Sequence, residues 1–126
     1  MMEDKTYNLF VYGTLKENQS NHHYLSKSPV MKTRIAGFTL YTVDGMGYPV
    51  ALPSDKSSDY ILGEVYKISA EQLEAIDRLE VKDVLYSREE YRMQQQGFWT
   101  KGYVYIGIPE YWENYKNLKH IGAEWS

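Results

Sequence analysis

The sequence predicts an α+β domain in which the sheet curls into a small mixed β-barrel with flanking short helices. Short apolar runs rich in β-favouring residues recur along the chain, and Gly, Pro, Ser and Asp separate them. Only one segment carries a strong helix-start signal. Because 126 residues are typical of one domain, we expect a single unit over 1–126, with a core of about 7–106 and an aromatic C-terminal tail of 107–126.

The expected strands share an apolar or alternating composition and end at turn-forming residues. They are residues 7–12, 31–43 with a bend at Gly37, 48–52 as an edge segment, 61–68, and a hairpin of 87–95 with 98–106 around Gln96-Gly97.

Two helices are expected between these strands. Ser20 or Asn21 could cap a short helix through residues 22–25. The stronger signal is Ser69 with Gln72 three residues later, which is a capping box that satisfies the free backbone donors at a helix start.

Composition excludes several classes of chemistry. The net charge of −3, from 14 basic and 17 acidic residues, creates no field for nucleic acid. The absence of cysteine removes disulfides, thiolates and Cys-based zinc sites. His22 and His23 are adjacent and His120 is distant in sequence, so we expect no metal site and no metal cofactor. Nucleotide-binding glycine loops and nucleophile elbows are also missing.

The first residues indicate where the protein works. Acids stand at Glu3 and Asp4 where a secretory signal would carry bases, and the apolar run after them is short. We therefore expect a cytoplasmic protein with neither a membrane nor a nucleic-acid partner.

Glu80 is the candidate acid/base. Leu73, Ile76 and Glu80 are spaced i, i+3, i+7, so they share the apolar face of the expected helix. A partly buried carboxylate near a helix C-terminus should have a raised pKa, which suits proton transfer near neutral pH. The alternative is that the helix frays at Leu79 and that Glu80 turns to water. The neighbouring acids Glu74 and Asp77, with Arg78, are expected on a solvated face.

Gly13 and Thr14 follow the first strand directly. A glycine turn there can bring backbone N–H groups together around a carboxylate or an oxyanion. Strand–glycine turns are common, so the pattern alone leaves a purely structural role open.

Several motifs together resemble the gamma-glutamylcyclotransferase-like family, which includes gamma-glutamylamine cyclotransferases and AIG2-like proteins. They are FVYGTLK at 10–16, Asn21-His22, GEVY at 63–66, IDRLE at 76–80 and YSR at 86–88. The match runs in order from about residue 7 to 106.

The resemblance implies a cofactor-independent enzyme that cyclises a gamma-glutamyl group to 5-oxoproline and releases a free amine. Glu80 would be its acid/base, and the turn of Tyr12, Gly13, Thr14 and Leu15 would hold the glutamyl group. The Thr14-Leu15 form of the turn favours the gamma-glutamylamine branch, although the amine itself stays open.

Two positions depart from the family pattern, since Asn18 and Val81 stand where glycine is frequent. Asn18 tolerates left-handed backbone angles, whereas Val81 implies a different exit from the helix.

Tyrosines near the expected site leave their roles open. Tyr105 and Tyr103 on the last expected strand are candidates for closing the pocket and donating a hydroxyl, whereas strand tyrosines are commonly structural. Tyr86 and Arg88 are equally open, and Arg88 could simply pair at a sheet edge.

Other functions compete with this interpretation. The fold could serve as a non-catalytic binding module that uses a surface containing Trp99, Trp112 and Trp125. The aromatic tail, with Tyr111 and Tyr115, could join two copies into a homodimer or pack as a lid on its own domain. Monomer and homodimer both remain open.

Overall fold

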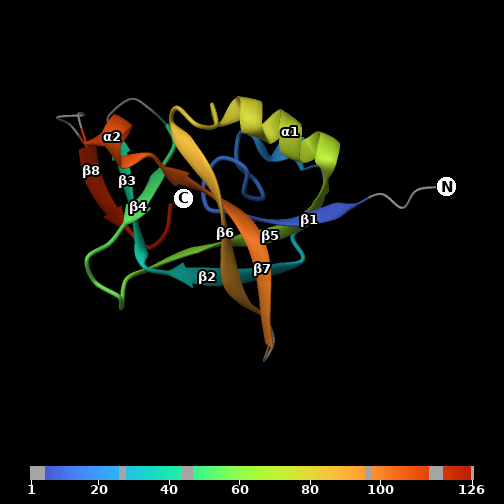
Figure 1. Ribbon diagram of the computed structural model, residues 1–126, viewed down its shortest axis with the longest axis horizontal. Coiled ribbons are helices and arrows are strands. Elements are labelled where there is room, and N and C mark those ends of the chain that lie inside the picture. The colour runs from blue at the N-terminus through green and yellow to red at the C-terminus, as the bar shows by residue number, and fades with distance from the viewer. Residues whose placement is uncertain (1–4, 26–27, 44–46, 96–97, 114–117, 126) are drawn as a thin grey trace.

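The computed structural model describes residues 5–25, 28–43, 47–95, 98–113 and 118–125. A five-stranded mixed sheet dominates it, with the strand order β2-β5-β1-β7-β6 (Figure 1). These strands are β1 (Thr6–Val11), β2 (Met31–Ala36), β5 (Tyr60–Ser69), β6 (Tyr86–Gln95) and β7 (Phe98–Gly107). The β1–β7 pair is parallel and the other pairs are antiparallel.

The sheet curls, because its two edge strands, β2 and β6, contact each other. The result is a half-barrel with short helices, so the predicted fold class is confirmed. The predicted hairpin is also confirmed as β6 and β7, which pair from Tyr86↔Gly107 to Gln95↔Phe98. Its turn at Gln96-Gly97 lies outside the described residues.

A second, three-stranded sheet has the order β4-β3-β8. Its strands are β3 (Phe38–Val43), β4 (Val50–Pro53) and β8 (Leu118–Gly122). The expected bend at Gly37 is confirmed, since its φ of 91° belongs to the left-handed region that glycine favours. This bend sends β2 and β3 into different sheets. The edge position expected for the segment 48–52 is confirmed as well, because β4 lies at the edge of this sheet.

Helix α1 (Ala70–Leu79) begins where the capping box predicts. The Gln72 N–H donates to Ser69 Oγ at 3.1 Å, and the Ser69 N–H donates to Gln72 Oε1 at 2.9 Å. The helix buries Leu73 and Ile76 and packs against β1, β5 and the 3₁₀ turn His22–Tyr24. Its C-terminal end therefore points toward the turn that follows β1.

The short helix expected at 22–25 is only this 3₁₀ turn, and its predicted side-chain cap is wrong. Asn21 stands at the N-cap position, but no side chain caps the turn. The Asn21 side chain instead donates to Thr14 Oγ1 at 2.8 Å, so it braces the Gly13-Thr14 turn.

The described parts of the aromatic tail pack on their own chain. Helix α2 (Pro109–Trp112) buries Trp112 to 1% exposure, and its indole N–H donates to the Leu85 carbonyl at 2.8 Å. The tail then adds β8 to β3. This agrees with the lid alternative, while a homodimer stays a prediction and Tyr115 lies outside the described residues.

The aromatic surface suggested for a binding module needs a correction. Trp112 belongs to the core, and Trp125 is half-buried against it. Trp99 is exposed and stacks with Arg92, so the three indoles do not form one surface.

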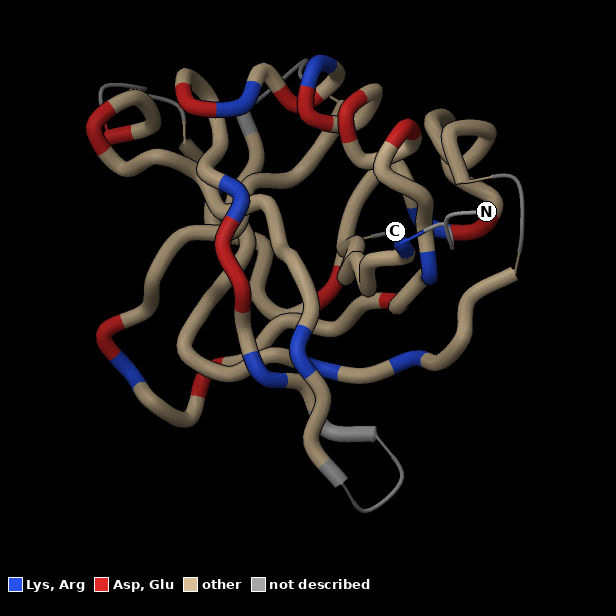
Figure 2. The backbone as a smooth tube through the Cα atoms, turned by 45° about the vertical axis from the view of Figure 1, so that its right-hand side comes forward, with Lys and Arg blue, Asp and Glu red and all other residues tan. Residues whose placement is uncertain are grey.

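Charged residues are distributed along the backbone. Figure 2 shows basic and acidic positions scattered over a mostly uncharged tube, and α1 carries the acids Glu71, Glu74 and Asp77 beside one base, Arg78. Within the described ranges, every helix is too short or too polar to cross a membrane.

Candidate active site

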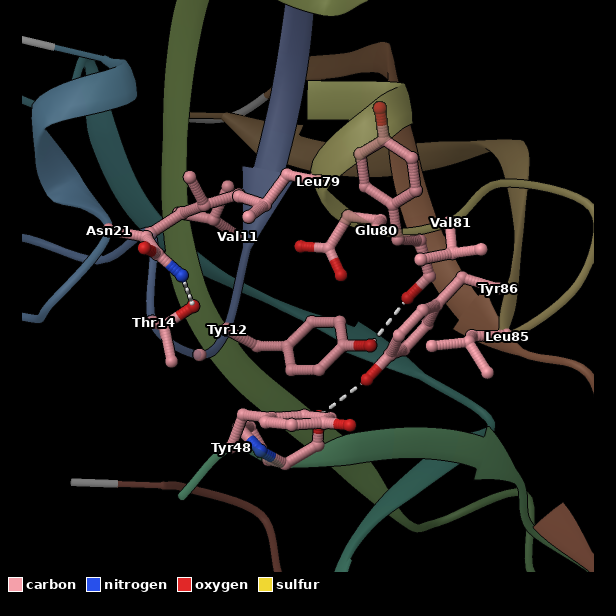
Figure 3. A pocket seen from close by; sticks show the side chains of 14 residues that line it. Val11, Tyr12, Thr14, Asn21, Tyr48, Leu79, Glu80, Val81, Leu85 and Tyr86 are labelled. Atoms are coloured by element: carbon pink, nitrogen blue, oxygen red, sulfur yellow. Dashed lines mark hydrogen bonds between the residues drawn. The ribbon is translucent and has the colours of Figure 1, made fainter. Parts of the chain in front are cut away.

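A pocket of about 320 Å³ opens where the end of α1 faces the turn after β1 (Figure 3). The pocket is formed by the end of β1 with its turn, Asn21 before the 3₁₀ turn, the approach to β4, the exit of α1, the start of β6 and the end of β7. Its lining comprises Val11, Tyr12, Gly13, Thr14, Leu15, Asn21, Tyr48, Pro49, Leu79, Glu80, Val81, Leu85, Tyr86 and Tyr105. All six residues expected at the site line this one pocket.

Glu80 is the C-cap residue of α1 and lies among these lining residues. Figure 3 shows its carboxylate inside the pocket, above the ring of Tyr12. The side chain is half-buried, and burial raises the pKa of Glu80 from 4.5 to about 7. The helix does end at Leu79, as the alternative expected, but Glu80 lies in the pocket instead of turning out to bulk water. Among the described residues that line the pocket, Glu80 alone is charged.

The chain leaves α1 through a tight Schellman-type end. The Val81 N–H donates to the Arg78 carbonyl at 3.2 Å, and the Lys82 N–H donates to the Asp77 carbonyl at 3.0 Å. Val81 has a φ of 50°, in the left-handed conformation that glycine usually supplies at this position. The expected different exit is thus wrong: valine adopts the glycine-like exit, with backbone strain.

The turn of Tyr12, Gly13, Thr14 and Leu15 presents backbone donors. The Gly13 carbonyl accepts the Lys16 N–H at 3.0 Å, which closes the turn. Within the described part of the chain, the N–H groups of Gly13, Thr14 and Leu15 have no hydrogen-bond partner. All three residues line the pocket, so their N–H groups are available to an anionic or carbonyl oxygen.

Glycine is required at position 13 by a close approach. A Cβ there would lie 2.8 Å from Cδ of Pro49, which is shorter than any relaxed contact. Pro49 is buried and lines the pocket, so the pocket depends on a backbone that touches this ring.

The turn is braced from behind by polar side chains. Asn21 holds Thr14 through its side chain and also through its backbone N–H, which donates to the Thr14 carbonyl at 2.8 Å. His22 Nδ1 lies 3.1 Å from the Leu15 carbonyl oxygen. Because this oxygen can only accept, the contact is a hydrogen bond in the tautomer that carries the proton on Nδ1. The Glu17 N–H donates to Glu64 Oε1 at 2.8 Å. The donors of the turn are therefore fixed before any ligand arrives.

The hydroxyls of Tyr12 and Tyr86, which line the pocket, are already hydrogen-bonded. Tyr12 donates to the Tyr105 carbonyl at 2.5 Å and accepts the Ala51 N–H at 3.3 Å. Tyr86 donates to the Pro49 carbonyl at 3.0 Å. Burial, followed by the nearby Glu80 charge, raises the pKa of Tyr12 far above its usual value. These phenols shape the pocket with their rings, and none is poised to titrate near neutral pH.

Tyr105 lines the pocket as expected, but its hydroxyl points to another partner. It donates to Asp77 Oδ1 at 2.6 Å, and burial followed by this carboxylate raises the pKa of Tyr105. Arg88 Nη1 lies 2.6 Å from Asp77 Oδ2 in the same group, and the Arg88 guanidinium stacks 4.8 Å from the ring centre of Tyr103. Tyr103 itself lies outside the pocket lining.

This group corrects two expectations. Asp77 is not on a solvated face, because its side chain is only 22% exposed and is bonded on both oxygens. Arg88 does not merely pair along a sheet edge but ties β6 to α1, one turn before Glu80. The network thereby fixes the helix end that carries the carboxylate.

Sequence reasoning missed the wall formed by Tyr48, Pro49 and Leu85. Nothing in their local pattern marks them, because they approach the turn only through tertiary packing. No group of three metal-ligating side chains converges within the described residues.

Comparisons with known proteins agree with this geometry. A family profile described as "Gamma-glutamyl cyclotransferase, AIG2-like" matches residues 9–126. The gamma-L-glutamyl-butirosin B gamma-glutamyl cyclotransferase of Niallia circulans is 36% identical over 107 residues, covering 79% of this chain and 65% of that protein. The gamma-glutamylcyclotransferase family protein YtfP of Escherichia coli K12 is 30% identical, covering 77% of this chain and 80% of its own length.

The fold is similar to that of a solved mouse AIG2-like protein. The two superpose with a TM-score of 0.68 over 84% of this chain and 82% of the mouse chain, at 24% identity. With the profile covering nearly the whole sequence, the chain belongs to the gamma-glutamyl cyclotransferase, AIG2-like family.

Proposed function

We propose that this protein cyclises a gamma-glutamyl amine to 5-oxoproline and releases the free amine. One observation carries the proposal: a half-buried carboxyl with a pKa of about 7, on Glu80, shares a pocket with three unpartnered N–H groups of the described turn. A carboxyl with this pKa exchanges protons readily at neutral pH. The three N–H groups can donate hydrogen bonds to an oxygen of the substrate.

The reaction starts from a substrate that carries an α-ammonium group. Ionised Glu80 takes one proton from it, and the freed amine attacks the γ-carbonyl carbon, which forms the new N–C bond. The γ-amide C–N bond then breaks, and its electron pair stays on the departing nitrogen. Glu80 delivers that proton to the departing nitrogen, accepts the second proton from the ring nitrogen, and passes it to the released amine.

The proton count closes with one carboxyl. Two protons leave the α-nitrogen and two reach the departing amine, which leaves as an ammonium ion, so Glu80 ends ionised as it began. The free α-ammonium has a pKa of about 8, and this is close enough to that of Glu80 for transfer in both directions.

The turn contributes orientation and charge stabilisation. The N–H groups of Gly13, Thr14 and Leu15 would hold the α-carboxylate or the oxygen of the γ-carbonyl as it becomes negative. A glutamyl chain has several rotatable bonds, and fixing it in the cyclising shape removes much of the entropic barrier.

The gamma-glutamylamine branch is favoured by the Thr14-Leu15 form of the turn. The relative from Niallia circulans is named for a gamma-glutamyl conjugate of butirosin B, which is consistent with an amide whose departing group is not an α-amino acid. We extend that reaction class, without the butirosin itself, to this chain.

The test is an assay for 5-oxoproline by mass spectrometry with gamma-glutamyl amines and gamma-glutamyl dipeptides. We expect the lactam from at least one amine, and a loss of 100-fold or more in kcat for Glu80→Gln, because general acid/base catalysis typically contributes that much. Glu74→Gln is the control, since Glu74 lies on the same helix but is 75% exposed. Silence across the panel from folded protein would favour the binding module instead.

A further inference from the structure

We propose that the pocket contains a subsite for an apolar leaving amine, formed by Val81, Leu85 and the ring of Tyr86. We call this the amine subsite. The inference rests on the proposed function, because it names the class of amine that the same site releases. The preferred substrates are gamma-glutamyl amides of short aliphatic or arylalkyl amines rather than of polyamines or other cations.

The layout of the pocket gives the direction of the substrate. In Figure 3, Thr14 and Asn21 lie on one side of the Glu80 carboxylate, and Val81, Leu85 and Tyr86 lie on the other. In the proposed reaction the N–H groups of the turn hold the glutamyl part on the first side, where Gly13, Thr14 and Leu15 line the pocket. The scissile nitrogen must come within reach of Glu80, so the group attached to it extends toward the amine subsite.

The side chains that form this subsite offer mainly carbon atoms to a ligand. Val81 and Leu85 contribute aliphatic side chains, and Tyr86 contributes a ring whose hydroxyl is committed to the Pro49 carbonyl at 3.0 Å. An amine with further polar groups would lose hydration here without gaining hydrogen bonds from these walls. An alkyl chain would instead gain from leaving water.

A cationic leaving group also lacks a counter-charge in the pocket lining. Glu80 alone is charged among the described lining residues, and it is the proposed acid/base. Apart from Glu80, the acid nearest in sequence to the subsite walls is Asp83, which is paired with Lys82 at 3.0 Å. A second positive charge on the amine would therefore meet no free carboxylate at these positions.

The backbone of Val81 supports the assignment independently. Its φ of 50° is costly for a β-branched side chain, and glycine would relieve the strain. Strained residues of this kind tend to persist at functional sites. Val81 is 43% exposed and lines the pocket, so folding of the core gives little reason for a valine there. A substrate contact supplies a reason.

The experiment measures kcat/KM for gamma-glutamyl methylamide, ethylamide, n-butylamide and benzylamide, beside the gamma-glutamyl amides of putrescine and of the lysine side chain. Since each buried CH₂ is worth a factor of about four, a half-open subsite should give a rise of about two- to fourfold per methylene up to butyl. The kcat/KM should also be higher for the butylamide than for the putrescine amide, which has the same four carbons and one added charge.

Val81→Thr keeps the shape of the side chain and replaces one methyl group by a hydroxyl. We expect it to lower the ratio of butylamide to methylamide kcat/KM about threefold. Val84→Thr is the matched control, because Val84 belongs to the same turn, is 55% exposed and does not line the pocket. The control should leave the ratio as it is in the unmodified protein.

The outcomes separate the two proposals. No 5-oxoproline from any amide would refute the proposed function itself. Turnover that is indifferent to alkyl length, or higher for the putrescine amide than for the butylamide, would overturn the amine subsite while leaving the cyclotransferase function standing. An equal fall in the ratio for both threonine variants would also contradict a specific role for Val81.

Discussion

The burial of Glu80 predicts that replacing the proposed acid/base by glutamine stabilises the protein at alkaline pH. Burial raises the pKa of this carboxyl from 4.5 to about 7. The folded protein therefore keeps the proton over a pH range in which the unfolded chain has lost it. A raised folded-state pKa gives stability that is complete below about pH 4.5 and is lost as the pH rises through about 7.

The size of the effect follows from the same two values. The difference between 4.5 and about 7 corresponds to about 3 kcal/mol of unfolding free energy. Glutamine has nearly the same shape and never ionises. Glu80→Gln should match the unmodified protein near pH 4.5 and exceed it by up to about 3 kcal/mol above pH 8, which corresponds to a Tm difference on the order of 10 °C.

The assay is urea denaturation at pH values from 4.5 to 8.5, comparing the unmodified protein with Glu80→Gln. Only the difference between the two profiles is used, because histidines and other acids titrate in both. Glu74→Gln serves as the control, and its exposed pair with Arg78 should matter by less than about 1 kcal/mol. Parallel profiles for Glu80→Gln and the unmodified protein would refute the buried-carboxyl reasoning.

The remaining predictions concern the surroundings of the carboxyl. With 5-oxoproline as the readout, kcat/KM should rise with pH to half its maximum near 7 as Glu80 ionises, and a flat profile from pH 5 to 8 would argue against it. Gly13→Ala should cost about 1–3 kcal/mol and lower kcat/KM, since its Cβ would sit 2.8 Å from Pro49; thermal melts and kinetics check both. Asp77→Asn should cost about 1–3 kcal/mol in urea denaturation, because it leaves a half-buried guanidinium without a carboxylate, and an unchanged midpoint would contradict this. Val81→Gly should add about 1 kcal/mol by relieving the left-handed valine, and a loss of stability would count against the strain.

Local signals made much of the fold predictable. The Ser69 capping box placed the start of α1, and the breaks at Gly37 and Gln96-Gly97 separated strands that the structure has in the same positions. Each of these signals depends on a few consecutive residues, so the sequence alone carries it. The apolar spacing of Leu73 and Ile76 likewise identified the buried face of α1.

The polar partners of the site could not be predicted in the same way. Asp77 belongs by spacing to an outer face of α1, and only the docking of β6 and β7 brings Arg88 and the Tyr105 hydroxyl to it. Pro49 approaches Gly13 closely although the two residues are far apart in the sequence. Such contacts depend on how elements pack, and side-chain periodicity within one element has no information on them.

The way the chain leaves α1 helps to explain the raised pKa of the Glu80 carboxyl and its position in the pocket. The Schellman bonds from Val81 and Lys82 end the helix directly after Glu80, and the ion pair of Asp77 with Arg88 fixes the turn before it. These bonds fix the backbone on both sides of Glu80 and so keep its carboxyl in the pocket, where burial raises its pKa. Loosening either restraint should let the pKa of Glu80 fall back toward its ordinary value. The strained exit and the near-neutral carboxyl are therefore linked properties of one structural element.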